Sequence, residues 1–89
     1  MSGAARTARM RRPSRLLVER LEASLAALGE SESTLRAGLL VQLAATCRLS
    51  GDWDRGIAAA DEAVALGDAR WQAEALLHQG EMRRTRGDW

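Results

Sequence analysis

Cys47 and His78 are the side chains that nucleophilic or metal chemistry would use first. The sequence has one cysteine and one histidine, so the usual four Cys and His ligands of a zinc site are not available. A Cys–His nucleophile pair is formally possible. Cys47, however, falls on the apolar stripe of a predicted helix, which favours a buried structural thiol. His78 falls near the middle of another predicted helix, where we expect it to face solvent or line a groove.

A glycine pair offers a second candidate, a phosphate-binding loop. The spacing Gly51-x4-Gly56 suits such a loop, but Ile57 and Ala58 stand where a lysine and a Ser or Thr are required. Helix capping and solvation account for the acidic residues that follow, which lack the spacing of a metal loop: Asp52, Asp54, Asp61 and Glu62. The sequence therefore predicts no catalytic residue, no metal ligand and no cofactor, and we do not expect an enzyme.

The composition indicates an all-helical chain of one small domain. The 89 residues include one proline and no Phe or Tyr, and Ala, Leu, Arg and Glu dominate. Residues 1–15 carry five arginines and no acid, whereas the rest carries eight arginines and twelve acids. We expect residues 1–13 to be a disordered basic leader. With no long apolar run and no secretory signal, we expect a cytoplasmic protein without membrane contact.

Hydrophobic spacing predicts four helices. The first follows Pro13 and carries a stripe of leucines at positions 17, 21, 25 and 28. The second starts near a cap at Ser33 or Thr34 and ends at Ser50. The third runs to residue 66, and the fourth spans about 69–86 after a cap at Asp68. Because the turns between them are short, the helices must pack as antiparallel neighbours.

The sequence Gly51-Asp52-Trp53 returns as Gly87-Asp88-Trp89, 36 residues later. The same shift aligns further pairs: Leu40 with Leu76, Val41 with Leu77, Ala44 with Gly80, and Arg48 with Arg84. A period in this range is typical of a repeat array, in which each unit is one supersecondary element. Small residues at positions 44 and 80 would let helix backbones approach closely.

These features resemble the tetratricopeptide (TPR) repeat, a helix–turn–helix unit of about 34 residues. The first copy reads Leu40-x2-Leu43-Ala44-x2-Cys47, followed by Gly51-Asp52-Trp53 at the turn. The looser period is similar to the helical repeats of large bacterial transcriptional regulators of the LuxR and antibiotic-regulator type. The resemblance implies a short TPR-like α-solenoid over residues 14–89, with one complete repeat at about 37–70.

Counting repeats gives a further expectation. A single repeat cannot bury its apolar face alone, and about three are needed for a stable array. We therefore expect either a fragment of a longer protein or a chain that completes its core by self-association.

The function that we expect is a non-catalytic interaction or scaffold module that binds a protein or peptide partner. The candidate partner-binding residues are Gln42, Trp71, His78, Gln79 and Arg83, with Cys47 also lining the expected groove. Two alternatives are a small helix-turn-helix DNA-binding module and a self-associating structural protein. The acids of the third helix would repel phosphates, so the sequence does not favour nucleic acid as a partner.

Overall fold

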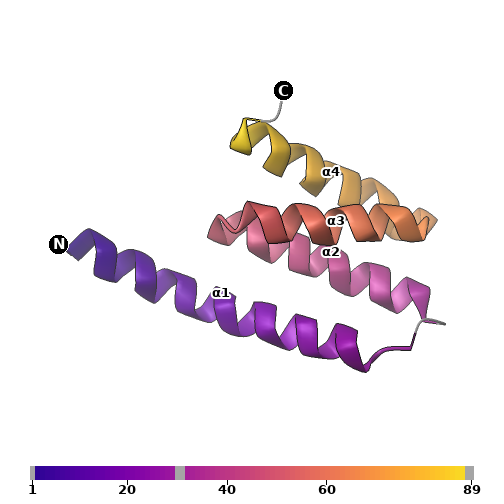
Figure 1. Cartoon of the computed structure of the whole chain (residues 1–89), viewed down its shortest axis with the longest axis horizontal. Coiled ribbons are helices and arrows are strands. Elements are labelled where there is room, and N and C mark those ends of the chain that lie inside the picture. The colour runs from indigo at the N-terminus through magenta and orange to yellow at the C-terminus, as the bar shows by residue number, and fades with distance from the viewer. Residues whose placement is uncertain (1, 30–31, 88–89) are drawn as a thin grey trace.

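Four α-helices make up the fold. The computed structural model describes residues 2–29 and 32–87, with side chains from Arg15 onward. The helices are α1 (Ser2–Ala27), α2 (Ser33–Ser50), α3 (Trp53–Leu66) and α4 (Ala69–Arg86), and no strand occurs in these residues (Figure 1). The predicted all-α class and the four helices are confirmed. The predictions for Trp89 lie outside the described residues.

The first helix is longer than the sequence predicts. It begins at Ser2 and not at Pro13, so it includes the stretch that we expect to be a disordered leader. Ala4, Ala5 and the arginines that follow are strong helix formers, which explains why helical backbone extends through this stretch. The first buried side chain is Val18. A domain boundary near Pro13 therefore stays a prediction.

Glycines end the last three helices. Gly51 and Gly67 follow α2 and α3 with φ of 82° and 70°, in the left-handed region that only glycine adopts without strain. The Asp68 side chain accepts a hydrogen bond from the Arg70 backbone N–H at 2.9 Å, which confirms the predicted cap of α4. The predicted cap at Ser33 or Thr34 is wrong. Glu32 holds that position, without a side-chain cap bond.

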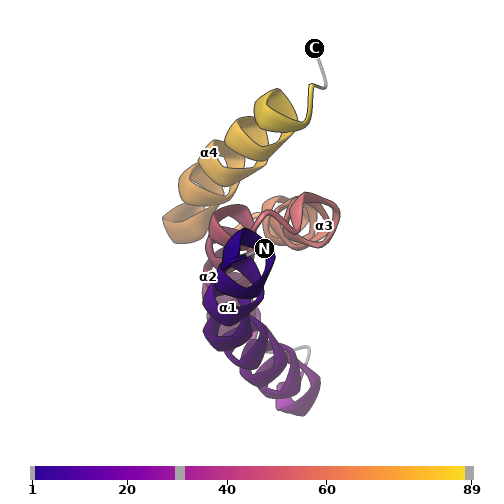
Figure 2. The same ribbon diagram turned by 90° about the vertical axis from the view of Figure 1, so that its left-hand side faces the viewer.

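Helix α2 is the central element. It packs against α1, α3 and α4, and α4 also packs against α3 (Figure 1). Figure 2 shows α3 projecting to one side of α2, while α4 crosses above the pair. The result is a flat molecule with extents of 48 × 33 × 16 Å.

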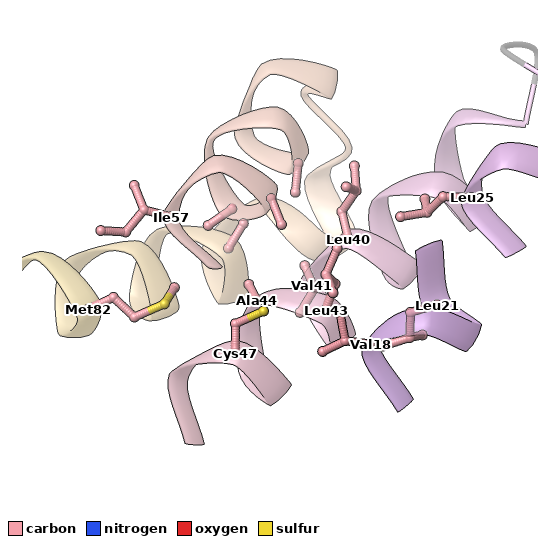
Figure 3. Packing of buried hydrophobic residues seen from close by; sticks show 14 residues of the cluster. Val18, Leu21, Leu25, Leu40, Val41, Leu43, Ala44, Cys47, Ile57 and Met82 are labelled. Atoms are coloured by element: carbon pink, nitrogen blue, oxygen red, sulfur yellow. The ribbon is translucent and has the colours of Figure 1, made fainter. Parts of the chain in front are cut away.

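The core lies along α2 and is built largely from small residues (Figure 3). Its members come from all four helices: Val18, Leu21, Leu25, Leu40, Val41, Leu43, Ala44, Cys47, Ile57, Ala59, Ala60, Ala63, Ala75 and Met82. One predicted core position is wrong. Leu17 is 47% exposed and Val18 only 4%, because the buried stripe of α1 runs through residues 18, 21 and 25.

Gly56 is where α3 approaches α2 and α4 most closely. A Cβ atom at this position would lie 2.5 Å from Met82 Sδ and 2.9 Å from Cys47 Cβ. Only glycine fits at this distance, so residue 56 sets how tightly the three helices pack.

Candidate partner-binding surface

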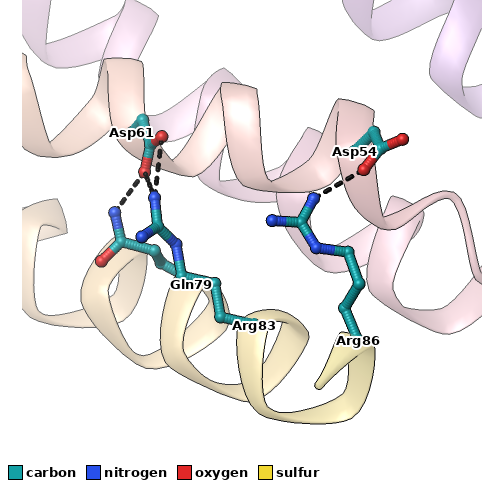
Figure 4. A network of polar contacts seen from close by, with 5 residues as sticks. All are labelled: Asp54, Asp61, Gln79, Arg83 and Arg86. Atoms are coloured by element: carbon teal, nitrogen blue, oxygen red, sulfur yellow. Dashed lines mark hydrogen bonds and ion pairs between the residues drawn. The ribbon is translucent and has the colours of Figure 1, made fainter. Parts of the chain in front are cut away.

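Two of the predicted partner-binding residues hold α4 on α3. Gln79 donates a hydrogen bond from its amide to Asp61 Oδ1, and the Arg83 guanidinium pairs with the same carboxylate at 3.2 Å (Figure 4). One turn further along, Arg86 pairs with Asp54 at 2.6 Å. The side chains of Gln79 and Arg83 thus already have partners within the chain.

Trp71 lies in the seam between α2 and α4. Its indole ring packs against Gly38, where a Cβ atom would lie 3.1 Å from the ring. The residue is half-buried and packs against the core. Its position supports a packing role, and part of the residue stays accessible.

His78 is buried on the same seam. It is 9% exposed, and its Nδ1 atom has no hydrogen-bond partner in the described chain. Burial lowers the pKa of His78, and the nearby Arg48 guanidinium lowers it further. We therefore expect the imidazole to be neutral at pH 7, which differs from the solvent-facing position that the sequence allowed.

Stability is expected to fall as the solution is acidified through about pH 6.5, the ordinary pKa of histidine. Because the folded chain binds a proton at His78 less readily than the unfolded chain does, protonation favours unfolding. Thermal melts of the wild type and of His78→Gln between about pH 7.5 and pH 5.5 measure this difference. The variant should show a flatter profile, and equal slopes would contradict a neutral buried imidazole.

Cys47 lies in the core and not in a groove. It is fully buried, and this burial, with a smaller contribution from the Asp52 carboxylate, raises the pKa of its thiol to about 11. A nucleophilic cysteine needs the opposite shift, toward the thiolate. The structural role predicted for this thiol therefore agrees with its surroundings.

Alkylation of Cys47 by iodoacetamide at about pH 8 is expected to be at least about a hundredfold slower in the native chain than in urea. The raised pKa alone lowers the thiolate fraction by about that factor, and burial slows the reagent further. A native rate equal to the rate in denaturant would show that the thiol is accessible.

Of the predicted partner-binding residues, Gln42 and Arg83 are exposed, and Arg83 pairs with Asp61. Gln42 lies on α2 between two exposed leucines, Leu35 at 59% and Leu49 at 81% exposure. The three are seven residues apart and so share one face of the helix. This face of α2 is free to contact a partner.

A second exposed apolar face lies on α4, and the sequence did not predict it as a candidate surface. Leu76 is 48% exposed and Leu77 is 57% exposed, on the side away from the buried Ala75 and Met82. The signal was present in the sequence, because apolar residues occur on two opposite sides of this helix. Large exposed apolar residues that cluster in this way are typical of contact surfaces.

A groove also runs between α1 and α3, with α2 as its floor. Two hollows of about 530 and 370 Å³ lie along it. The Arg55–Glu22 ion pair, at 3.8 Å, crosses between the two helices there. Acids and arginines alternate along the rim, so the groove offers neither a strongly acidic nor a strongly basic surface.

Comparisons with known proteins give no match. No family model, no curated protein and no solved structure is similar to this chain at a significant level. Within the described residues, no helix combines the length and apolar character needed to cross a membrane. The same residues hold no group of three or more His, Cys, Asp or Glu side chains placed to bind a metal ion.

Proposed function

We propose that this chain is a non-catalytic interaction module built from TPR-like helical hairpins. The observation that carries the proposal is a contact of the same kind made by two side chains one repeat apart. Gln72 of α4 donates from its amide to the Val64 carbonyl of α3 at 3.2 Å. Arg36, at the equivalent position of α2, donates to the Leu25 carbonyl of α1 at 3.3 Å. The acceptors differ by about one turn, because the 36-residue shift places Val64 on Leu28 and not on Leu25. The likeness supports a related packing of α1 on α2 and of α3 on α4.

The order of helix packing supports the same proposal. Helix α4 packs on both members of the α2–α3 hairpin, as the first helix of a following repeat would. The N-terminal ends of α2 and α4 lie close, since Thr34 donates to Asp68 Oδ2 at 2.8 Å. Further along both helices, Trp71 packs on Gly38 and His78 lies near Arg48, so the two helices run in the same direction. The arrangement favours an array over a closed bundle.

The wider setting that we propose is the helical-repeat region of a bacterial transcriptional regulator in the cytoplasm. The support is the resemblance of two sequences, Leu49-Ser50-Gly51-Asp52-Trp53 and Asp61-Glu62-Ala63-Val64-Ala65, to repeats of that kind. In such a setting the module would supply a surface for a protein or peptide and no chemistry of its own.

The charges of α3 do not favour the DNA-binding alternative. A recognition helix needs free basic side chains facing the phosphates. Arg55 of α3 instead pairs with Asp52 at 3.6 Å and with Glu22 at 3.8 Å. The other charged residues of this helix are acids.

Panning a displayed random-peptide library against the immobilised chain tests the proposed function. We expect enriched peptides with Kd values near about 10 µM, bound on the free face of α2. Gln42→Arg should weaken them at least about tenfold, an effect of about 1.4 kcal/mol. The matched control is Ala65→Arg, which places the same side chain on the exposed side of α3. Failure to enrich any peptide, or equal binding by both variants, would contradict the proposal.

A further inference from the structure

We propose that copies of this chain associate head to tail, with α4 of one copy receiving α1 and α2 of the next. The inference rests on the proposed function, because it treats the chain as a segment of a repeat array. Its basis is a comparison of residues that are equivalent by the 36-residue shift but differ in burial.

The first open surface is the outer face of α4, here called the C-terminal face: Ala73, Glu74, Leu76, Leu77, Gly80 and Arg84. Leu76 and Leu77 are 48% and 57% exposed. Their equivalents in α2, Leu40 and Val41, are 3% and 2% exposed because neighbouring helices cover them. The C-terminal face thus corresponds by the 36-residue shift to the buried apolar surface of α2. On α4 no neighbouring helix among the described residues covers this surface.

Gly80 gives the C-terminal face a second unusual feature. It lies inside α4 with nothing within 4 Å of its missing Cβ. A glycine within a helix is less stable there than alanine, and no contact among the described residues uses the small size of Gly80. Its equivalent, Ala44, is fully buried. A packed helix at this position would use the space that Gly80 leaves open.

The second open surface is the outer face of α2, here called the N-terminal face: Leu35, Leu39, Gln42, Thr46 and Leu49. Four of these residues correspond in α4 to the surface that packs on α2: Trp71, Ala75, His78 and Met82. Met82 and Ala75 are fully buried, whereas Leu35 is 59% exposed. The N-terminal face thus corresponds by the 36-residue shift to the surface with which α4 packs on α2. In the described chain no helix packs on the N-terminal face in the same way.

The exposed leucines follow this division. Six large hydrophobic side chains are exposed among the described residues: Leu16, Leu17, Leu35, Leu49, Leu76 and Leu77. Two lie on α1 and two on the central helix α2, whereas two lie on α4, at the opposite side of the molecule from α1 (Figure 1). None lies on α3, which packs on α2 and α4. Exposed apolar area is therefore concentrated where further repeats would pack.

Each open face fits the other because together they repeat an interface that the chain already contains. Inside the chain, Trp71 contacts Gly38. The equivalent contact between two copies joins Leu35 of the second copy to Glu74 of the first. Arg48 lies near His78 inside the chain, where burial and this guanidinium lower the pKa of the imidazole. The equivalent intermolecular pair is Arg84 and Gln42, a guanidinium donor and an amide acceptor.

A head-to-tail contact leaves one face free at each end of the assembly. Such a contact is heterologous, and it produces open chains unless the rotation between copies closes a ring. The average mass is therefore expected to continue rising with concentration and not to stop at a dimer.

Sedimentation velocity of the full chain over roughly a hundredfold concentration range tests the proposal. Three single variants accompany the wild type: Leu77→Arg on the C-terminal face, Leu35→Arg on the N-terminal face, and Ala65→Arg on the exposed side of α3. We expect the wild type and Ala65→Arg to associate to the same extent. The Leu35 and Leu77 variants should each remain monomeric, with unchanged helicity by circular dichroism because both sites are exposed.

The decisive sample is an equimolar mixture of Leu35→Arg and Leu77→Arg. One variant retains an intact N-terminal face and the other an intact C-terminal face, so the mixture should form a one-to-one dimer and nothing larger. A monomeric wild type, a monomeric mixture, or a dimer that both substitutions leave intact would each overturn the inference. If the wild type stays monomeric and still binds displayed peptides, only the head-to-tail inference fails. Because association covers the same face of α2, peptide binding is also measured on the monomeric Leu77→Arg variant, whose N-terminal face is intact. Loss of peptide binding by that variant contradicts the partner-binding function alone.

Discussion

Gly56→Val is expected to destabilise the chain more than any other single change considered above. The Cβ atom would lie 2.9 Å from Cys47 Cβ and 2.5 Å from Met82 Sδ, and valine adds two further methyl groups. Met82 is flexible, but it is fully buried and has little space into which to move. Overpacking of this kind costs about 1–3 kcal/mol and occasionally more. We expect a loss of about 3 kcal/mol, measured by urea unfolding followed by circular dichroism.

Gly80→Ala is the matched control, since residue 80 is also a helical glycine. Nothing lies within 4 Å of its missing Cβ, so the added methyl group meets open space. We expect a gain of up to about 1 kcal/mol from helix propensity when the chain is measured at its lowest practical concentration. Equal effects at positions 56 and 80 would show that α3 does not approach α2 and α4 as described.

Leu40→Ala and Leu76→Ala are expected to differ strongly although the two leucines occupy equivalent repeat positions. Leu40 is 3% exposed and belongs to the core, so its truncation should cost about 2–5 kcal/mol. In a domain of this size such a loss removes most of the stability, which is of the order of 5 kcal/mol. Leu76 is 48% exposed, and we expect its truncation to cost less than about 1 kcal/mol.

Urea titrations of both variants, again at low protein concentration, measure this difference. A cost at Leu76 similar to that at Leu40 would mean that the outer face of α4 is already covered in the isolated chain. At high concentration the proposed association should itself cover Leu76. The gap between the two variants should then narrow, because binding stabilises the folded state by mass action.

Helix number and turns were predictable from the sequence because they depend on local signals. Gly51, Gly67 and Asp68 act through their own backbone or their nearest neighbours, and the structure confirms each of them. The start of α1 and its buried face were less predictable. Leu17 and Val18 are adjacent and both apolar, so only the packing of α1 on α2 decides which one is buried.

The roles of the surface residues could not be predicted from local sequence, because they depend on contacts between residues that are distant in the chain. Nothing local to Gln79 or Arg83 shows that Asp61, about twenty residues earlier, lies opposite both of them. These polar groups were therefore assigned to a partner when they serve the chain itself. Gln42 is exposed, and its role in binding stays a prediction.

The position of α1 determines the order in which the helices are expected to unfold. In the described chain α1 packs along α2 and does not pack on α4, whereas α2, α3 and α4 all contact one another. Opening of α1 therefore leaves the other three helices with their mutual contacts intact. Backbone amides of α1 should exchange with deuterium earlier than those at the centre of α2, in separate cooperative steps. Such a chain would unfold from its N-terminal edge inward, as a row of units does, and not in one event.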